Sequence, residues 1–117
     1  MDKIRTELSI NTEVIEKMAE IAAKEVEGVI GLSKKAYDLR GAVKSQKAFK
    51  GVKIEEVNGA VKIKVYITVD ESAHVKEVAE KVQENIKDRV QTMAGTAVTQ
   101  INVVVADIKF GVANKED

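Results

Sequence analysis

The residues best suited to chemistry lie together at positions 70–74. This segment holds Asp70, Glu71, Ser72 and His74, and His74 is the one histidine of the chain. Nucleophilic catalysis needs a serine or cysteine hydrogen-bonded to a placed base. Ser72 and His74 lie two residues apart at the expected start of a helix, where their side chains do not converge. We therefore expect Ser72 to cap the helix, His74 to be solvated, and the chain to have no catalytic residue and no enzyme activity.

Metal and cofactor sites are also not indicated. Asp70, Glu71 and His74 could gather around a hard cation, but acids at a helix start are more often caps, and no EF-hand spacing is present. Glu55 and Glu56 are neighbours in an expected strand, so they point to opposite faces and share neither a proton nor a metal. The chain contains no cysteine, which excludes thiolate ligands and disulfides. We expect no metal and no cofactor.

The composition is that of one globular domain without net charge. The chain has 117 residues, 44% hydrophobic and 32% charged, which is enough for a core without disulfides. Nineteen basic residues balance nineteen acidic ones, so no overall field attracts polyanions. No run approaches the roughly 18 apolar residues of a spanning helix, and residues 1–7 do not resemble a signal peptide. We expect a cytoplasmic protein.

Apolar spacing predicts the elements of the first half. Residues 4–10 alternate with a period of two, which is typical of a half-buried strand. Asn11 is a suitable N-cap for a helix that ends at Gly28. The expected apolar stripe of this helix is Val14, Ile15, Met18, Ile21, Ala22 and Val26.

Residues 29–51 are predicted to form a long basic connection, in which 36–48 has the composition of a short helix. Long loops on a rigid scaffold often carry function, so this segment is the expected docking surface. Its candidate interaction residues are Lys34, Lys35, Arg40, Lys44, Lys47 and Lys50.

The second half is predicted to contain a hairpin, a helix and a strand. Asn58-Gly59 between two β-like runs, 52–57 and 60–69, predicts a type I′ turn. A helix is expected from Ser72 to Gly95, and a strand from 97 to 110. The change of parity along this strand indicates either a bulge or a strand covered on both faces near its middle. The expected stripe of this helix is Val75, Val78, Ala79, Val82, Ile86, Val90 and Met93.

The predicted fold is therefore a two-layer α+β sandwich with the order β-α-loop-β-β-α-β. Two helices pack on one face of a mostly antiparallel four-stranded sheet whose strand order stays open. We expect one domain over residues 1–110 and a frayed tail over 111–117.

The same element order occurs in RNA-recognition modules, which stack bases on several aromatic residues of an open sheet face. Here the open side of 60–69 offers Lys62, Lys64 and Thr68 with Tyr66 as its one aromatic residue. The lysines could hold a phosphate backbone weakly. Nonspecific nucleic-acid binding, through the basic residues 34–50, therefore stays open as the alternative function.

Several blocks of the sequence resemble the bacterial alkaline shock protein family. The matching residues are Ile10, 13–15, 22–32, 50–54, 65–69, 78–83, 93–95, 98, 102–105 and 108. Two positions depart from the family pattern: Thr12 stands where proline is usual, and Asp70-Glu71 where Tyr-Gly is usual.

The resemblance implies a setting rather than a site. It implies a non-enzymatic protein of envelope or alkaline stress that acts through protein–protein interaction. Self-association and docking to a small membrane-anchored protein are the two interactions implied. It also implies a cytoplasmic location, with membrane attachment through such a partner, and it supplies no catalytic residues.

Overall fold

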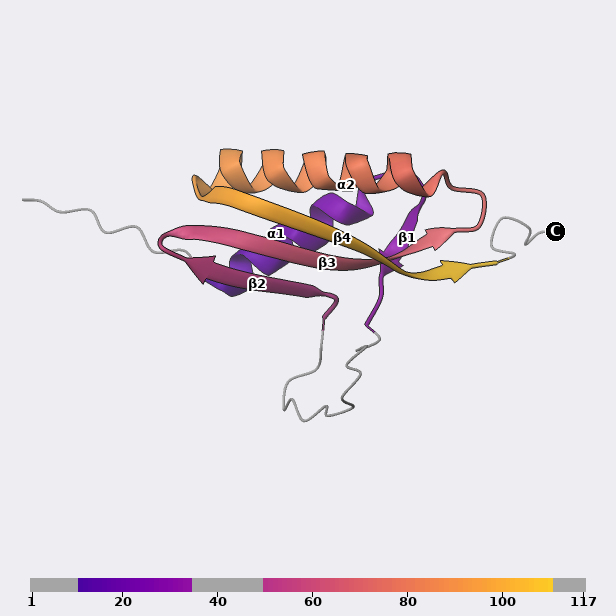
Figure 1. Cartoon of the computed structure of the whole chain (residues 1–117), viewed down its shortest axis with the longest axis horizontal. Helices are drawn as coiled ribbons and strands as arrows, with labels where there is room; N and C mark the ends of the chain where they lie inside the picture. The colour runs from indigo at the N-terminus through magenta and orange to yellow at the C-terminus, as the bar shows by residue number, and fades with distance from the viewer. Residues whose placement is uncertain (1–10, 35–49, 111–117) are drawn as a thin grey trace, which may run out of the picture.

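The structure is a computed structural model that describes residues 11–34 and 50–110. The described chain runs α1 (Thr12–Lys24), β1 (Val29–Leu32), β2 (Val52–Val57), β3 (Ala60–Asp70), α2 (Val75–Arg89), a π-helical turn (Val90–Ala94) and β4 (Ala97–Lys109) (Figure 1). The predicted strand 4–10, the predicted helix within 36–48 and the tail 111–117 lie outside the described residues. The α+β class, with two helices and a four-stranded sheet, is confirmed.

The first helix begins as expected and ends earlier than expected. The side chain of Asn11 accepts a hydrogen bond of 2.8 Å from the backbone N–H of Glu13, which caps the helix. The helix ends at Lys24, so the predicted end at Gly28 is wrong. Gly28 instead has a φ of +101° in the turn that carries the chain into β1, a conformation that residues with a Cβ rarely adopt.

The prediction of an irregular connection over 29–51 is wrong at its start, where β1 forms. Val29–Leu32 pairs antiparallel with the end of β3, from Val69 to Ile67. The strand is only four residues long and includes Gly31, and so short an apolar run offers little periodicity from which to predict it.

The hairpin of β2 and β3 is confirmed. Asn58 and Gly59 have φ angles of 52° and 83°, the positive pair that a type I′ turn requires. β2 pairs with residues 60–65 of β3 and β1 with residues 67–69, so both lie along one edge of β3. β4 pairs parallel with β3 along its other edge. The sheet therefore has four strands but is three strands wide.

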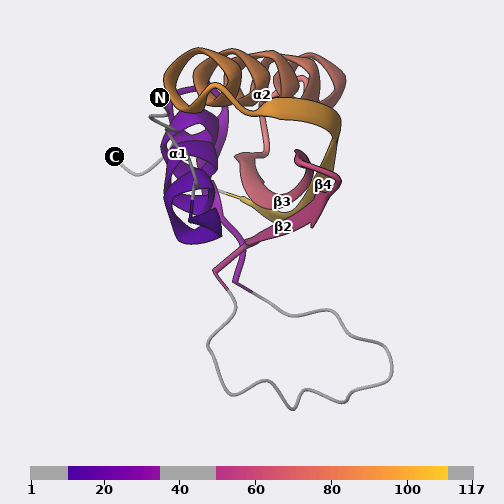
Figure 2. The same ribbon diagram turned by 90° about the vertical axis from the view of Figure 1, so that its left-hand side faces the viewer.

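The core lies between the two helices and one face of the sheet (Figure 2). Figure 2 shows α1 on one side and α2 above, with the sheet curving beneath α2 and beside α1. The apolar residues of β3 that were predicted to be buried are buried: Val61, Ile63, Val65, Ile67 and Val69 are each at most 2% exposed.

The predicted helix stripes are too wide. Four residues of the predicted stripes are 41–62% exposed: Val14 and Ile21 of α1, Val75 at the start of α2, and Met93 in the π-helical turn. The predicted stripes of the two helices contain more apolar residues than a sheet three strands wide can cover. Thr68, expected on the open side of the sheet, is instead buried.

Candidate interaction surfaces

The residues at positions 70–74 do not form a catalytic or metal-binding arrangement. α2 begins at Val75 with His74 at its N-cap position, and His74 makes no side-chain capping bond. The prediction that Ser72 caps the helix is therefore wrong: its backbone N–H donates to Asp70 Oδ1 at 3.3 Å, which closes the turn before the helix. Within the described residues, no three or more His, Asp or Glu side chains lie close enough together to hold a metal ion.

The basic residues predicted to bind partners are mostly outside the described part of the chain. Lys34 and Lys50 are described, and both are exposed. Lys35, Arg40, Lys44 and Lys47 lie outside it, so the structure neither gathers nor separates the six.

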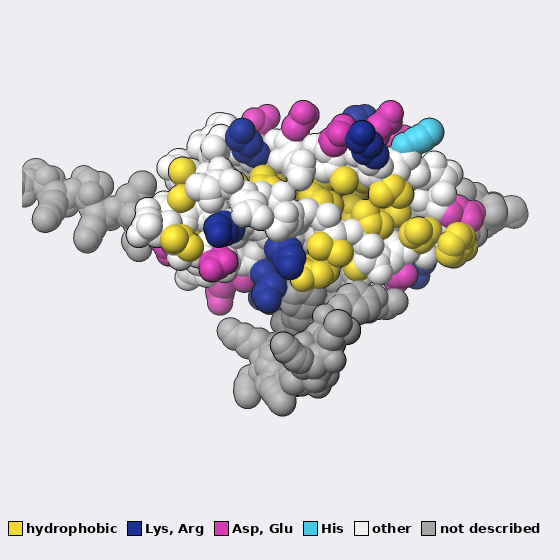
Figure 3. All heavy atoms as spheres, in the orientation of Figure 1, with side chains coloured by type: hydrophobic (Ala, Val, Ile, Leu, Met, Phe, Trp, Pro, Cys, Tyr) yellow, Lys and Arg dark blue, Asp and Glu magenta, His cyan; other side chains and the backbone are white. Residues whose placement is uncertain are grey.

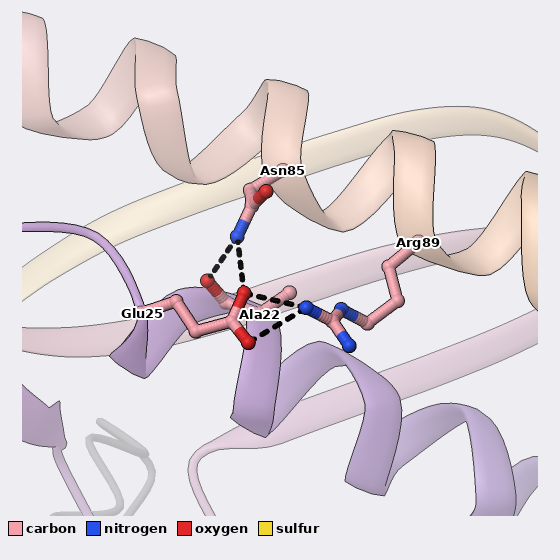
Figure 4. A network of polar contacts seen from close by, with 4 residues as sticks. All are labelled: Ala22, Glu25, Asn85 and Arg89. Atoms are coloured by element: carbon pink, nitrogen blue, oxygen red, sulfur yellow. Dashed lines mark hydrogen bonds and ion pairs between the residues drawn. The ribbon is translucent and has the colours of Figure 1, made fainter.

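A polar clasp between the helices was not predicted. The Asn85 amide donates to the Ala22 carbonyl at 2.8 Å and to Glu25 Oε1 at 3.1 Å, and Arg89 donates to both carboxylate oxygens of Glu25 (Figure 4). The Asn85 and Arg89 hydrogen bonds hold the pKa of the Glu25 carboxyl below its ordinary value of 4.5. The clasp fixes α1 against α2. The hydrogen bonds of the clasp join residues that are 60 to 64 positions apart in the sequence, so no local spacing reveals them.

The outer edge of β4 is the first surface that suits a partner. β4 is 13 residues long, about twice the usual length of a strand, and it pairs with β3 along one edge. Within residues 11–34 and 50–110, no strand pairs with its other edge. Residues 97–106 carry no charged side chain, although natural edge strands commonly carry charges that prevent unwanted pairing.

Two bulges divide β4 and leave one regular stretch between them. The register with β3 shifts between Val61 and Lys62 and again between Ile67 and Thr68. The predicted bulge is thus confirmed, and a second one was missed. Between the shifts, residues 100–105 pair without interruption opposite residues 62–67. We call residues 100–105 the edge segment.

The side chains of the edge segment are largely apolar and half-exposed. Ile101, Val103, Val104 and Val105 are all partly accessible, whereas their partners Ile63, Val65 and Ile67 on β3 are buried. Figure 3, in the orientation of Figure 1, shows apolar side chains gathered across the middle of the face along which β4 runs. Such a patch on a protein surface is typical of an interaction site.

One backbone group of the edge segment is already satisfied by a side chain. Gln83 of α2 donates a hydrogen bond of 3.0 Å to the carbonyl oxygen of Ile101. Backbone groups two residues apart along a strand point the same way. The N–H and C=O groups of Val103 and Val105 therefore share the direction of those of Ile101.

The second surface lies on the face of the sheet opposite the helices. A hollow of about 490 Å³ is lined there by Lys53 and Glu55 of β2, Lys62 and Lys64 of β3, and Gln100 and Asn102 of β4, together with Ile54 and Ile63. We call the six polar residues the lysine face. The register arranges them in two rows across the sheet: Lys53–Lys64–Asn102 and Glu55–Lys62–Gln100.

Comparison with known proteins places the chain in a family. The model of the alkaline shock protein 23 family, described as having a cell envelope-related function, matches residues 1–110. The uncharacterized protein YqhY of Bacillus subtilis is 32% identical over 112 residues, covering 93% of this chain and 82% of that protein. YloU of the same organism is 27% identical and covers 88% of each chain.

A further relative carries a functional name. A "stress response regulator gls24 homolog" of Streptococcus pyogenes serotype M3 is 27% identical over 91% of this chain, which spans 60% of that protein.

Among solved structures, a chain titled "MamM CTD" has a similar fold. Its TM-score is 0.58 at 18% identity, and the match covers 84% of this chain and 96% of that chain. Other matched chains of the same protein are titled as copper, nickel and manganese forms. At this identity the likeness concerns the fold alone.

Among the described residues, no helix is both long and apolar enough to cross a membrane. The sequence blocks, the α+β fold and the family match over residues 1–110 agree. The chain belongs to the alkaline shock protein 23 family, whose function is related to the cell envelope.

Proposed function

We propose that this protein is a non-enzymatic, cytoplasmic component of the envelope stress response that works by protein–protein interaction, and that its interaction surface is the edge segment of β4. The observation that carries the proposal is a long strand whose outer edge pairs with no described strand, whose residues 97–106 carry no charge, and whose apolar side chains are half-exposed. Such an edge is a template for a further strand, in which main-chain hydrogen bonds give affinity and alternate side chains give specificity.

The partner that best fits this edge is a second copy of the chain. Two edge segments related by a twofold axis at Val104 place Val103 of one copy opposite Val105 of the other. In this register the two residues form a hydrogen-bonded antiparallel pair, in which their N–H and C=O groups point across the outer edge. The two Val104 side chains then meet on the open face, and the contact uses the same residues on both copies, as a closed dimer does.

The register also satisfies the side chains. Val103 and Val105 pair with buried residues of β3 and so lie on the helix side, while Val104 pairs with Tyr66 on the open side. Across the twofold axis, each side chain of the edge segment therefore lies next to a side chain on the same face of the sheet. The resulting sheet is six strands wide, and the outer edge of β4 is covered in both copies.

The proposal is tested by sedimentation velocity of the wild-type chain and of Val104→Lys over a range of concentrations. Val104→Lys places two ammonium groups opposite each other at the twofold axis, so wild type is expected to dimerise and the variant to stay monomeric. Val57→Lys is the matched control, because Val57 is an exposed strand valine, 42% accessible, outside the edge segment. It is expected to dimerise like wild type.

A strictly monomeric wild type at about 100 µM, near the concentration of an abundant protein, would contradict the proposal, as would dimerisation of Val104→Lys equal to that of wild type. Far-UV circular dichroism and urea midpoints of the variants check that each remains folded.

A further inference from the structure

We propose that the lysine face binds the phosphate group of an anionic ligand, with Lys53, Lys64 and Asn102 as the residues that hold it. This site is independent of the edge segment and of the dimer, and it differs from the basic segment 34–50 considered from sequence.

The first observation is the arrangement of the charges. Lys53 of β2 and Lys64 of β3 are direct cross-strand partners, and Asn102 of β4 is the partner of Lys64 on the other side. Neighbouring strands lie about 4.8 Å apart. The backbone positions of the two lysines and the asparagine therefore lie within about 10 Å of one another, with their side chains on one face. Together they offer eight N–H donors. The hollow opens above them.

The second observation is that this pair of lysines opposes folding. Like charges directly opposite each other in an antiparallel pair are destabilising. Within the described part of the chain, no carboxylate forms an ion pair with Lys53, Lys62 or Lys64. Glu55 is the acid of the lysine face, and it is the cross-strand partner of Lys62. The row that contains Lys53 and Lys64 has no acid. An oxyanion bound between Lys53 and Lys64 would remove the repulsion.

Lys64 is held in place by its own strand. Its Nζ lies 5.9 Å from the centroid of the Tyr66 ring, within the range of a cation–π contact. This contact limits the freedom of a side chain that is otherwise exposed, so less entropy is lost when an anion binds.

The second row extends the site to larger ligands. Lys62 and Gln100 lie two residues along the strands from Lys64 and Asn102, which is about 7 Å. A ligand with a second anionic group at that separation can contact both rows. A small molecule with two phosphates and a single nucleic-acid strand both present such groups, and the shared chemistry is phosphate.

The test is a titration of the ¹⁵N-labelled chain followed by amide chemical shifts, at constant ionic strength, with inorganic phosphate as the first probe. We expect saturable shifts confined to the strands around Lys53, Lys64 and Asn102. Lys64→Gln is expected to raise the dissociation constant by about 10-fold or more, because one charge-assisted hydrogen bond is lost. Lys76→Gln, on the exposed side of α2, is the matched control and is expected to bind like wild type.

Two further probes identify the source of the phosphate. Tighter binding of pyrophosphate than of inorganic phosphate, with a six-nucleotide oligothymidylate no tighter, supports a small phosphorylated ligand. Tighter binding of the oligonucleotide, with added shifts near Lys62 and Gln100, supports a nucleic-acid strand.

Two results would overturn the inference: shifts spread over lysines elsewhere, including Lys76, or binding unchanged in Lys64→Gln. Thermal unfolding separates binding from a structural role, since Lys64→Gln should not lower the midpoint of the free protein. These readouts do not depend on dimerisation, which Val104→Lys tests separately.

Discussion

Replacing Gly28 by alanine should be among the most damaging of the conservative changes available in this chain, because two separate costs fall on one position. The φ of Gly28 is +101°, and a residue with a Cβ in such a conformation is strained by about 1–2 kcal/mol. A Cβ there would also lie 2.9 Å from Val78 Cγ2 and 3.3 Å from Ala73 Cβ. Overpacking of this kind costs about 1–3 kcal/mol.

The sum is a loss of about 2–5 kcal/mol from a total stability of about 5–15 kcal/mol. Two other glycines separate the contributions. Gly95 has a φ of +66° but nothing within 4 Å of its Cβ position, so Gly95→Ala should cost about 1–2 kcal/mol from strain alone. Gly31 lies in β1 with neither a positive φ nor a close neighbour, so Gly31→Ala should change stability by less than about 1 kcal/mol.

The assay is equilibrium unfolding in urea followed by far-UV circular dichroism, with midpoints compared at a common slope. All variants are measured at one low concentration, so that self-association does not contribute. A loss for Gly28→Ala no larger than that for Gly95→Ala would refute the reasoning, because it would mean that Val78 and Ala73 yield to the new methyl group without cost.

Two more predictions concern the core and the clasp. Ile86 is fully buried, so Ile86→Ala should lower the free energy of unfolding by about 2–5 kcal/mol. The side chain of Val75 is 41% exposed, so Val75→Ala should lower it by about 1 kcal/mol or less. Urea unfolding measures both variants, and equal losses would contradict the assigned core. The pKa of Glu25 is lowered by its hydrogen bonds from Asn85 and Arg89. The ionised carboxylate therefore stabilises the folded protein fully above the ordinary pKa of 4.5, and this contribution is lost as the pH falls through the lowered pKa. Glu25→Gln should therefore flatten the fall of the unfolding midpoint between about pH 5 and pH 3, and a parallel fall in variant and wild type would exclude this role.

The elements that sequence predicted well are those with a strong local signal. The Asn58-Gly59 turn needs positive φ at two adjacent residues, which few other dipeptides adopt readily. The alternation in β3 follows its position in the middle of the sheet, with one face on the core. Asn11 at the start of α1 acts through a contact two residues away.

What was not predicted depends on distant parts of the chain. Three apolar residues and a glycine at 29–32 give no clear period, and their pairing with β3 makes them a strand. Val14, Ile21 and Met93 have the spacing of core residues but face away from a sheet that is only three strands wide. The spacing of apolar residues along a helix predicts which of them share a face. It does not predict the width of the sheet against which that face packs.

The candidate surfaces show the same limit. The basic residues between 34 and 50 were noticed because they are close in sequence. Lys62 and Lys64 of the lysine face were noticed for the same reason, as alternating residues of one predicted strand. Their neighbours on β2 and β4 become visible only with the register. The outer edge of β4, with which no strand of the described residues pairs, likewise follows from the strand order, which sequence left open.

The central claim, that the edge segment of β4 joins two copies at Val104, is tested most directly by a charge swap. Val104→Lys and Val104→Glu are each expected to be monomeric in sedimentation velocity, because like charges meet at the twofold axis. An equimolar mixture is expected to sediment as a dimer, because the two charges are then opposite in sign. A mixture that stays monomeric while wild type dimerises, or single variants that dimerise like wild type, would contradict the claim.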